Sequence, residues 1–102
     1  MDKKKKLREI AYAVSGDKGT SANVGVIAYH EEDYATLIDE LTEERIASFF
    51  EHLKPTKVVR YELQNLWALN FILEGVLAGG LRGIEVDAHG KTLGQKVLEL
   101  EL

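Results

Sequence analysis

The residues best suited to chemistry lie together in one short segment, 15–23. This segment combines two glycines, three hydroxyl side chains, a carboxylate, an ammonium group and a carboxamide. Glycine lets the backbone turn so that successive N–H groups converge into an anion-binding nest, and a lysine adds a positive charge for phosphate or carboxylate. The segment therefore predicts a loop that binds an anion such as a phosphate or an acyl-CoA. The expected ligand-binding residues are Ser15, Gly16, Asp17, Lys18, Gly19, Ser21 and Asn23.

A polar connection between two strands is the alternative interpretation of this segment. In that case the side chains of Ser15 and Asp17 bond to their own backbone. Gly16 and Gly19 do not have the spacing of a P-loop, and no dinucleotide-binding fingerprint is present. Both interpretations remain open at this point.

Asn70 and Glu74 form a second candidate patch within the apolar run 66–77. We expect this run to be a helix that begins after Asn65 as its N-cap, and residues four apart on a helix share a face. The pair then belongs to a structural hydrogen-bond network or lines a small site in which Glu74 moves a proton.

Metal, cofactor and hydrolase sites are not predicted. The histidines His30, His52 and His89 are far apart and make no metal-binding pattern, and there is no nucleophile-elbow motif. Cysteine is absent, which excludes disulfides and thiolate ligands and is typical of a cytoplasmic protein. We therefore assign no catalytic residue from sequence and expect no cofactor.

Length and composition predict one domain. The chain has 102 residues, of which 45% are hydrophobic, and a formal net charge of -4. A small domain gains from further burial by self-association, which favours a homo-oligomer. The negative charge argues against nucleic-acid binding, and no apolar run is long enough to span a membrane. We expect a flexible basic tail over 1–6 and a single domain over 7–102.

The pattern of apolar residues predicts a two-layer α+β fold of the ferredoxin-like kind, with a four-stranded sheet and helices on one face. The C-terminal segment fits a short helix followed by an extended tail, or an edge strand, and we favour the helix. Strands are expected at 7–14, 23–29, 57–63 and 81–87, and helices at 31–41, 42–54 and 66–77.

Several motifs in one order resemble the C-terminal ferredoxin-fold domain of the acyclic terpene utilisation protein AtuA family. The chain departs from the family pattern at Thr20, where an acidic residue is expected, and at Gln64, where a proline is expected. The motifs lie at 15–19, 21–25, 60–63, 68–71, 79–80, 87, 90–91 and 93–94.

This resemblance implies a role in bacterial breakdown of terpenoid or related acyl-CoA compounds. A freestanding copy of the domain implies a small accessory subunit that docks on a separately encoded AtuA-type large subunit. The alternative is a small hydratase or isomerase acting on an acyl-CoA, with Lys18 holding a phosphate and Asp17 or Glu74 moving the proton. The sequence therefore leaves open whether the protein is an enzyme.

Overall fold

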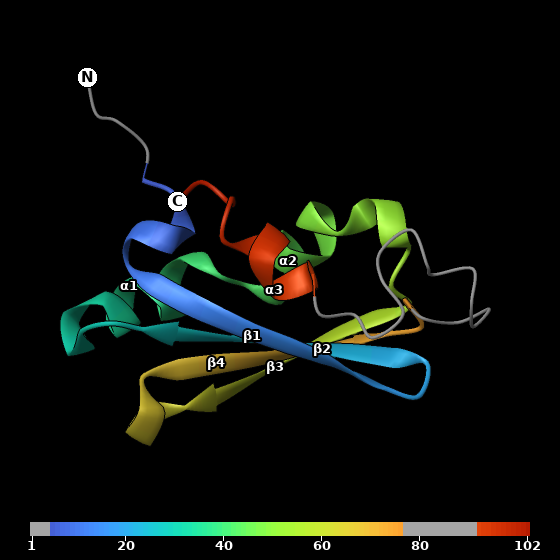
Figure 1. The fold of residues 1–102 in the computed structure, drawn as a ribbon, viewed down its shortest axis with the longest axis horizontal. Coiled ribbons are helices and arrows are strands. Elements are labelled where there is room, and N and C mark those ends of the chain that lie inside the picture. Colours follow the sequence, from blue (N-terminus) through green and yellow to red (C-terminus); the bar gives the residue numbers. More distant parts are fainter. Residues whose placement is uncertain (1–4, 77–91) are drawn as a thin grey trace.

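The structure is a computed structural model that describes residues 5–76 and 92–102. Its helices lie on one side of a sheet (Figure 1). No helix in the described part of the chain is long and apolar enough to cross a membrane. The strands are β1 (Ala11–Lys18), β2 (Ser21–Ala28), β3 (Lys57–Leu63) and β4 (Ala68–Glu74), and the α-helices are α1 (Glu31–Glu40), α2 (Glu43–Phe49) and α3 (Thr92–Val97).

The described strands form one antiparallel sheet in the order β1-β2-β4-β3. Two hairpins, β1–β2 and β3–β4, meet in the middle of the sheet, where β2 pairs with β4. Strands β2 and β3 therefore run in the same direction with β4 between them, and α1 and α2 connect them. This is the split βαβ unit of ferredoxin-like folds. The expected ferredoxin-like α+β fold is confirmed.

One face of the sheet packs against the helices and forms the core. Side chains alternate between the two faces along each strand, so every second residue of β2 and β4 points toward the helices. Because β2 and β4 are the central strands, their inward residues are covered on all sides. The large side chains that are fully buried in the core are Leu7, Val24, Val26, Leu37, Leu41, Ile46, Phe50, Leu69, Phe71, Leu73, Leu93 and Val97.

The helix expected over 66–77 is wrong, because most of this run forms strand β4. A nearly continuous apolar run fits a short buried strand as well as a buried helix, and periodicity alone does not separate them. Burial follows the strand period, with Leu69, Phe71 and Leu73 fully buried and the residues between them only partly buried. Asn65 does not cap a helix but lies in the 3₁₀ helix η3 (Gln64–Leu66) that joins β3 to β4.

The other expected elements are close to those observed. The strand expected at 7–14 is split into the 3₁₀ helix η1 (Leu7–Glu9) and β1, and the helix expected at 42–54 is α2 followed by η2 (Glu51–Leu53). The C-terminal helix with an extended tail is confirmed as α3. The strand expected at 81–87 lies outside the described residues.

The C-terminal tail runs beside the first described residues. The backbone N–H of Leu102 donates to the Lys5 carbonyl at 2.8 Å, and Lys6 forms a β-bridge with Glu101. The Lys6 ammonium also forms an ion pair with Glu99 at 2.9 Å. Both lysines, which we assigned to the flexible tail from sequence, therefore contact the other end of the chain.

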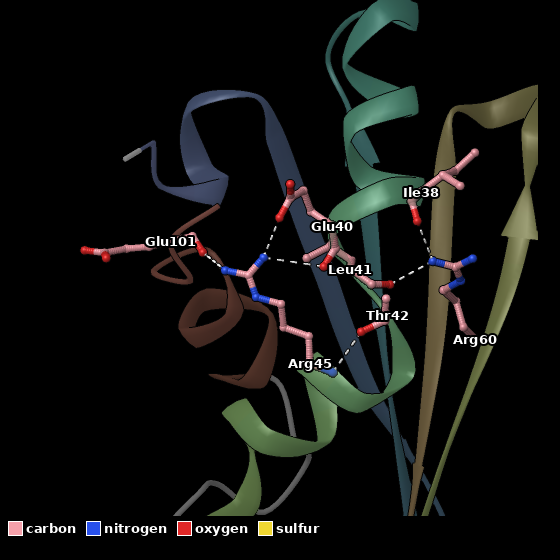
Figure 2. A network of polar contacts seen from close by, with 7 residues as sticks. All are labelled: Ile38, Glu40, Leu41, Thr42, Arg45, Arg60 and Glu101. Carbon is pink, nitrogen blue, oxygen red and sulfur yellow. Dashed lines mark hydrogen bonds and ion pairs between the residues drawn. The ribbon is translucent and has the colours of Figure 1, made fainter. Parts of the chain in front are cut away.

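Arg60 of β3 holds the C-terminal end of α1 (Figure 2). Its Nη1 donates to the carbonyl oxygens of Ile38 and Leu41, each at 2.9 Å. The last carbonyls of a helix have no partner within the helix, and a cation is favourable at this end of the helix dipole. A single side chain thus satisfies two carbonyls and ties α1 to the edge of the sheet.

The start of α2 is held by Thr42 and Arg45 (Figure 2). The Thr42 hydroxyl accepts a hydrogen bond from the Arg45 backbone N–H at 3.0 Å, as an N-cap does. The Arg45 guanidinium donates to the Glu40 carboxylate at 2.7 Å and to the Glu101 carbonyl. Residues around this arginine therefore join α1, α2 and the C-terminal tail.

We expect Thr42→Ala to lower the free energy of unfolding by about 1 kcal/mol, because the Arg45 N–H loses its acceptor. Urea denaturation followed by circular dichroism measures this change. Ser48→Ala, in the exposed face of the same helix, is the matched control and should change stability by less than about 0.5 kcal/mol. Equal effects of the two substitutions would contradict the capping role of Thr42.

Candidate functional site

The segment expected to be an anion-binding loop is a β-hairpin. Strands β1 and β2 continue through it, with Ser15 paired to Val24, Gly16 to Asn23 and Lys18 to Ser21. In an extended strand successive N–H groups point to opposite sides, so those of Ser15–Lys18 do not converge on one point. The prediction of a loop over these residues is therefore wrong, and so is the prediction of a backbone nest formed by their N–H groups.

The turn of the hairpin lies between Lys18 and Ser21. Gly19 has a φ of 69°, in the left-handed region that glycine adopts at little cost. Glycine at position 19 therefore favours the turn itself. Whether the side chains of the hairpin bind an anion stays a prediction.

The hairpin divides the predicted ligand-binding residues between the two faces of the sheet. Ser15 faces the helices, where its hydroxyl accepts a hydrogen bond from the Gly94 N–H at 2.9 Å. Gly94 lies in the first turn of α3, whose N–H groups have no partner within the helix. Ser15 thus acts as a cap supplied by a distant strand, and this structural contact accounts for one of the hydroxyls in the motif.

Gly94 allows α3 to approach β1 closely. A Cβ atom at this position would lie 3.1 Å from the Ser15 hydroxyl and 3.3 Å from the Val14 carbonyl carbon. Backbone at that distance does not yield as the end of a side chain does. The absence of a side chain at Gly94 therefore permits the short contact between α3 and Ser15.

Gly16, Asn23 and Asn70 lie on the opposite face, which we call the open face. It consists of the side of the sheet away from α1, α2 and α3 (Figure 1). The Asn23 carboxamide Nδ2 donates to Oδ1 of Asn70 at 3.4 Å, a long hydrogen bond near the centre of the sheet. The structure therefore brings together Asn23 and Asn70, which the sequence placed in two separate patches.

Glu74 is not a neighbour of Asn70, as it would be on a helix. Along strand β4 the two residues share the open face, but four residues of a strand span about 13 Å. Glu74 lies at one end of the face and pairs in register with Lys57 of β3. The extended strand thus separates Asn70 from Glu74, and the two residues do not form the second patch that we expected.

Large apolar side chains on the open face were not recognised as functional from sequence. The alternation of 57–63 and the apolar residues near position 12 were visible, but the pattern does not say which face the helices cover. By register, these side chains lie on the strands at the two edges of the sheet. They are Tyr12, Val14, Tyr61 and Leu63, with exposed fractions of 45%, 56%, 53% and 41%.

A surface hollow lies on the other side of β3, beside α1 and α2. Among its lining residues are Glu43, Glu44 and Glu62. Arg60, which also lines it, bonds to two carbonyls of α1 and to Glu62, and its backbone N–H donates to the Glu43 carboxylate at 2.8 Å. Its positive charge is thus engaged, and this acidic hollow does not suit an anion.

Tyr34 of α1 packs beneath this region. In the part of the chain described, its hydroxyl is a buried polar atom without a hydrogen-bond partner. Burial, more than the neighbouring Glu62 carboxylate, raises the pKa of Tyr34, whereas Arg60 opposes the rise. The phenol therefore stays protonated at neutral pH. Within residues 5–76 and 92–102, no three His, Asp or Glu side chains gather as metal ligands would.

Ser15→Ala tests whether the hydroxyl of this residue is structural. We expect the free energy of unfolding to fall by about 1 kcal/mol, because the Gly94 N–H loses its acceptor. Chemical denaturation measures the effect, with Ser21→Ala in the same hairpin as the control. If both variants were as stable as the wild type, the capping role of Ser15 would be excluded.

Comparison with known proteins supplies the family. The family model of the AtuA ferredoxin-like domain matches residues 5–102, essentially the whole chain. No curated protein and no solved structure matches it. The sheet order and the family match agree on the fold, so the chain belongs to the AtuA ferredoxin-like domain family.

Proposed function

We propose that the protein is an accessory binding subunit that docks on another protein chain through its open face. The observation that carries this proposal is the set of exposed apolar side chains on that face. An antiparallel sheet covered on one side normally alternates apolar and polar residues, with the polar ones toward water. Here both edge strands present apolar side chains to water, which is the composition of a surface that is covered in an assembly.

The composition of the face resembles the buried centre of a protein interface. Tyrosine is enriched in such centres and charged residues are depleted. Along the strands, Tyr12 and Val14 on β1 and Tyr61 and Leu63 on β3 flank the Asn23–Asn70 hydrogen bond. Completing the burial of each half-exposed side chain would contribute roughly 1 kcal/mol, or about 4 kcal/mol for the four.

The family suggests the setting in which the subunit works. We place it in the bacterial cytoplasm, in the breakdown of acyclic terpenoid or related acyl-CoA compounds. The partner is either a second copy of the chain or an AtuA-type large subunit. The family match and the exposed apolar face support this role.

An acyl-CoA-directed hydratase or isomerase is the second candidate. The observation in its favour is the pair of carboxamides, Asn23 and Asn70, side by side on an accessible face. Amide groups can hydrogen-bond a thioester carbonyl, and Lys18 and Asp17 of the nearby hairpin would supply the charge and the proton transfer. Such a site would depend on side chains rather than on a backbone nest.

We expect Val14→Lys to abolish the docking. The substitution puts a charge among the apolar side chains of the proposed interface, whereas Val14 is exposed enough for the fold to tolerate it. The measurement is light scattering coupled to size exclusion, on the chain alone and mixed with a purified AtuA-type large domain. Ala35→Lys, on the exposed side of α1, adds the same charge away from the face and should behave as the wild type. A wild-type chain that stays monomeric in both samples would refute the docking role.

A thermal-shift series with acetyl-CoA and a branched acyl-CoA tests the second candidate. A ligand present at 100 times its Kd should raise stability by about 2.7 kcal/mol, which is several degrees in Tm for a domain of this size. Asn70→Ala and Lys18→Ala should reduce the shift if these residues bind the ligand. An unchanged Tm of the wild type with both esters would reject the acyl-CoA site.

A further inference from the structure

The open face has an arrangement that fits a second copy of itself. We infer that two copies pack sheet against sheet, related by a two-fold axis that runs parallel to the strands between β2 and β4. This inference rests on the proposed docking role and names the occupant of the open face. It follows from the register of the four strands, from the absence of charge in the middle of the face and from the size of the face.

The strand register arranges the open face in rows that cross all four strands. One row consists of Tyr12, Ile27, Ala68 and Leu63, in the order β1-β2-β4-β3. A two-fold axis between β2 and β4 places each β1 residue opposite the β3 residue of the same row in the other copy. Tyr12 then faces Leu63, and Ile27 faces Ala68. In this row a large side chain of one central strand meets a small one of the other.

The next row repeats this complementarity. It consists of Val14, Gly25, Asn70 and Tyr61. The same axis places Val14 opposite Tyr61 of the second copy, and Asn70 opposite Gly25. Exposed apolar side chains thus meet at both edges, and the larger residue in the centre meets a glycine.

Charge is absent from the middle of this packing and opposes it only at one end of the face. The net charge of -4 repels two copies at long range, but the two rows described above and the row of Gly16, Asn23, Ile72 and Val59 contain no charged residue. The carboxamides of Asn23 and Asn70 already bond to each other, which lowers the cost of removing them from water. The charged residues Lys18, Lys57 and Glu74 follow in the row at the end of the face, where the axis brings Lys18 opposite Lys57 of the second copy. Glu74 pairs in register with Lys57 there, and water still reaches this row, which weakens the repulsion between the two lysines.

The size of the face approaches that of a stable interface. Strands of seven or eight residues and four strands across give a face of about 25 Å by about 19 Å. Two such faces cover roughly 950 Å² even if taken as flat, and side-chain relief raises the accessible area that is buried. Stable specific complexes bury about 1,200–2,000 Å² in total, and smaller interfaces belong to weak ones, so the open face suits a weak dimer at the lower end of this range.

Cross-linking between single cysteines tests both the partner and the axis, because the natural chain has no cysteine. Packed sheets lie about 10 Å apart and are twisted by about 30°, so a short bis-maleimide suits the distance. We expect Val14→Cys chains mixed with Tyr61→Cys chains to give a mixed dimer at least 5-fold more abundantly than either variant alone. An Ala35→Cys variant, with its cysteine on the helix side, is the control for random collision.

Each outcome decides the inference. A dimer by light scattering, together with preferential Val14–Tyr61 cross-links and an at least 10-fold weaker dimer in Val14→Lys, supports it. Preferential Val14–Val14 links overturn the axis, since they require β1 to face β1. A monomer at 100 µM overturns the second copy as occupant. If that monomer binds a large AtuA-type domain and Val14→Lys prevents the binding, the proposed docking role survives. If the monomer does not bind this domain either, the docking role and the inference of a second copy both fail.

Discussion

The pairing of β2 with β4 in the centre of the sheet is the constraint on which the other features of the protein depend. Their register places Val24 beside Phe71 on the helix side and Asn23 beside Ile72 on the open side. A slip of one residue would move one of the strands to the opposite face, so that an asparagine would enter the core. The buried apolar residues and the polar centre of the open face are therefore set by the same pairing.

The helices pack on the face of the sheet that this register makes apolar, and polar contacts hold them there. Arg60 reaches from β3 to the carbonyls at the end of α1, and the Ser15 hydroxyl reaches from β1 to the first turn of α3. Both contacts satisfy backbone groups that a helix leaves unpaired at its ends. In a domain of this size, such contacts position short helices whose own hydrogen bonds would not keep them folded.

The open face combines the properties expected of a binding surface. Its edges are apolar and half exposed, whereas its centre holds two carboxamides joined by a weak hydrogen bond. The same motif residues therefore divide into a structural group, represented by Ser15 and Gly94, and an accessible group, represented by Asn23 and Asn70. The similarity of a motif to a family does not by itself separate these two groups, because residues of both groups belong to the same motifs.

Much of the fold could be predicted from local patterns, and the errors have one cause. The pattern of apolar residues identified the strand at 57–63 and the helices at 31–41 and 42–54, since this pattern depends on neighbours in the chain. The run 66–77 was predicted to be a helix because its residues are nearly all apolar, and such a run has no distinctive period. Likewise, the small polar residues of 15–18 suggested a loop, although pairing with β2 holds them extended.

By itself, the sequence determined the two-layer α+β class, the family, the start of α2 at Thr42 and the small, polar character of the 15–23 segment. These properties depend on composition, local period and the order of motifs. Only the tertiary structure decided that Ser15 faces a helix, that Asn23 meets Asn70, and that Tyr12, Val14, Tyr61 and Leu63 share an exposed face. Each of these facts requires the register between strands far apart in the chain, which is set by long-range pairing that no local pattern contains.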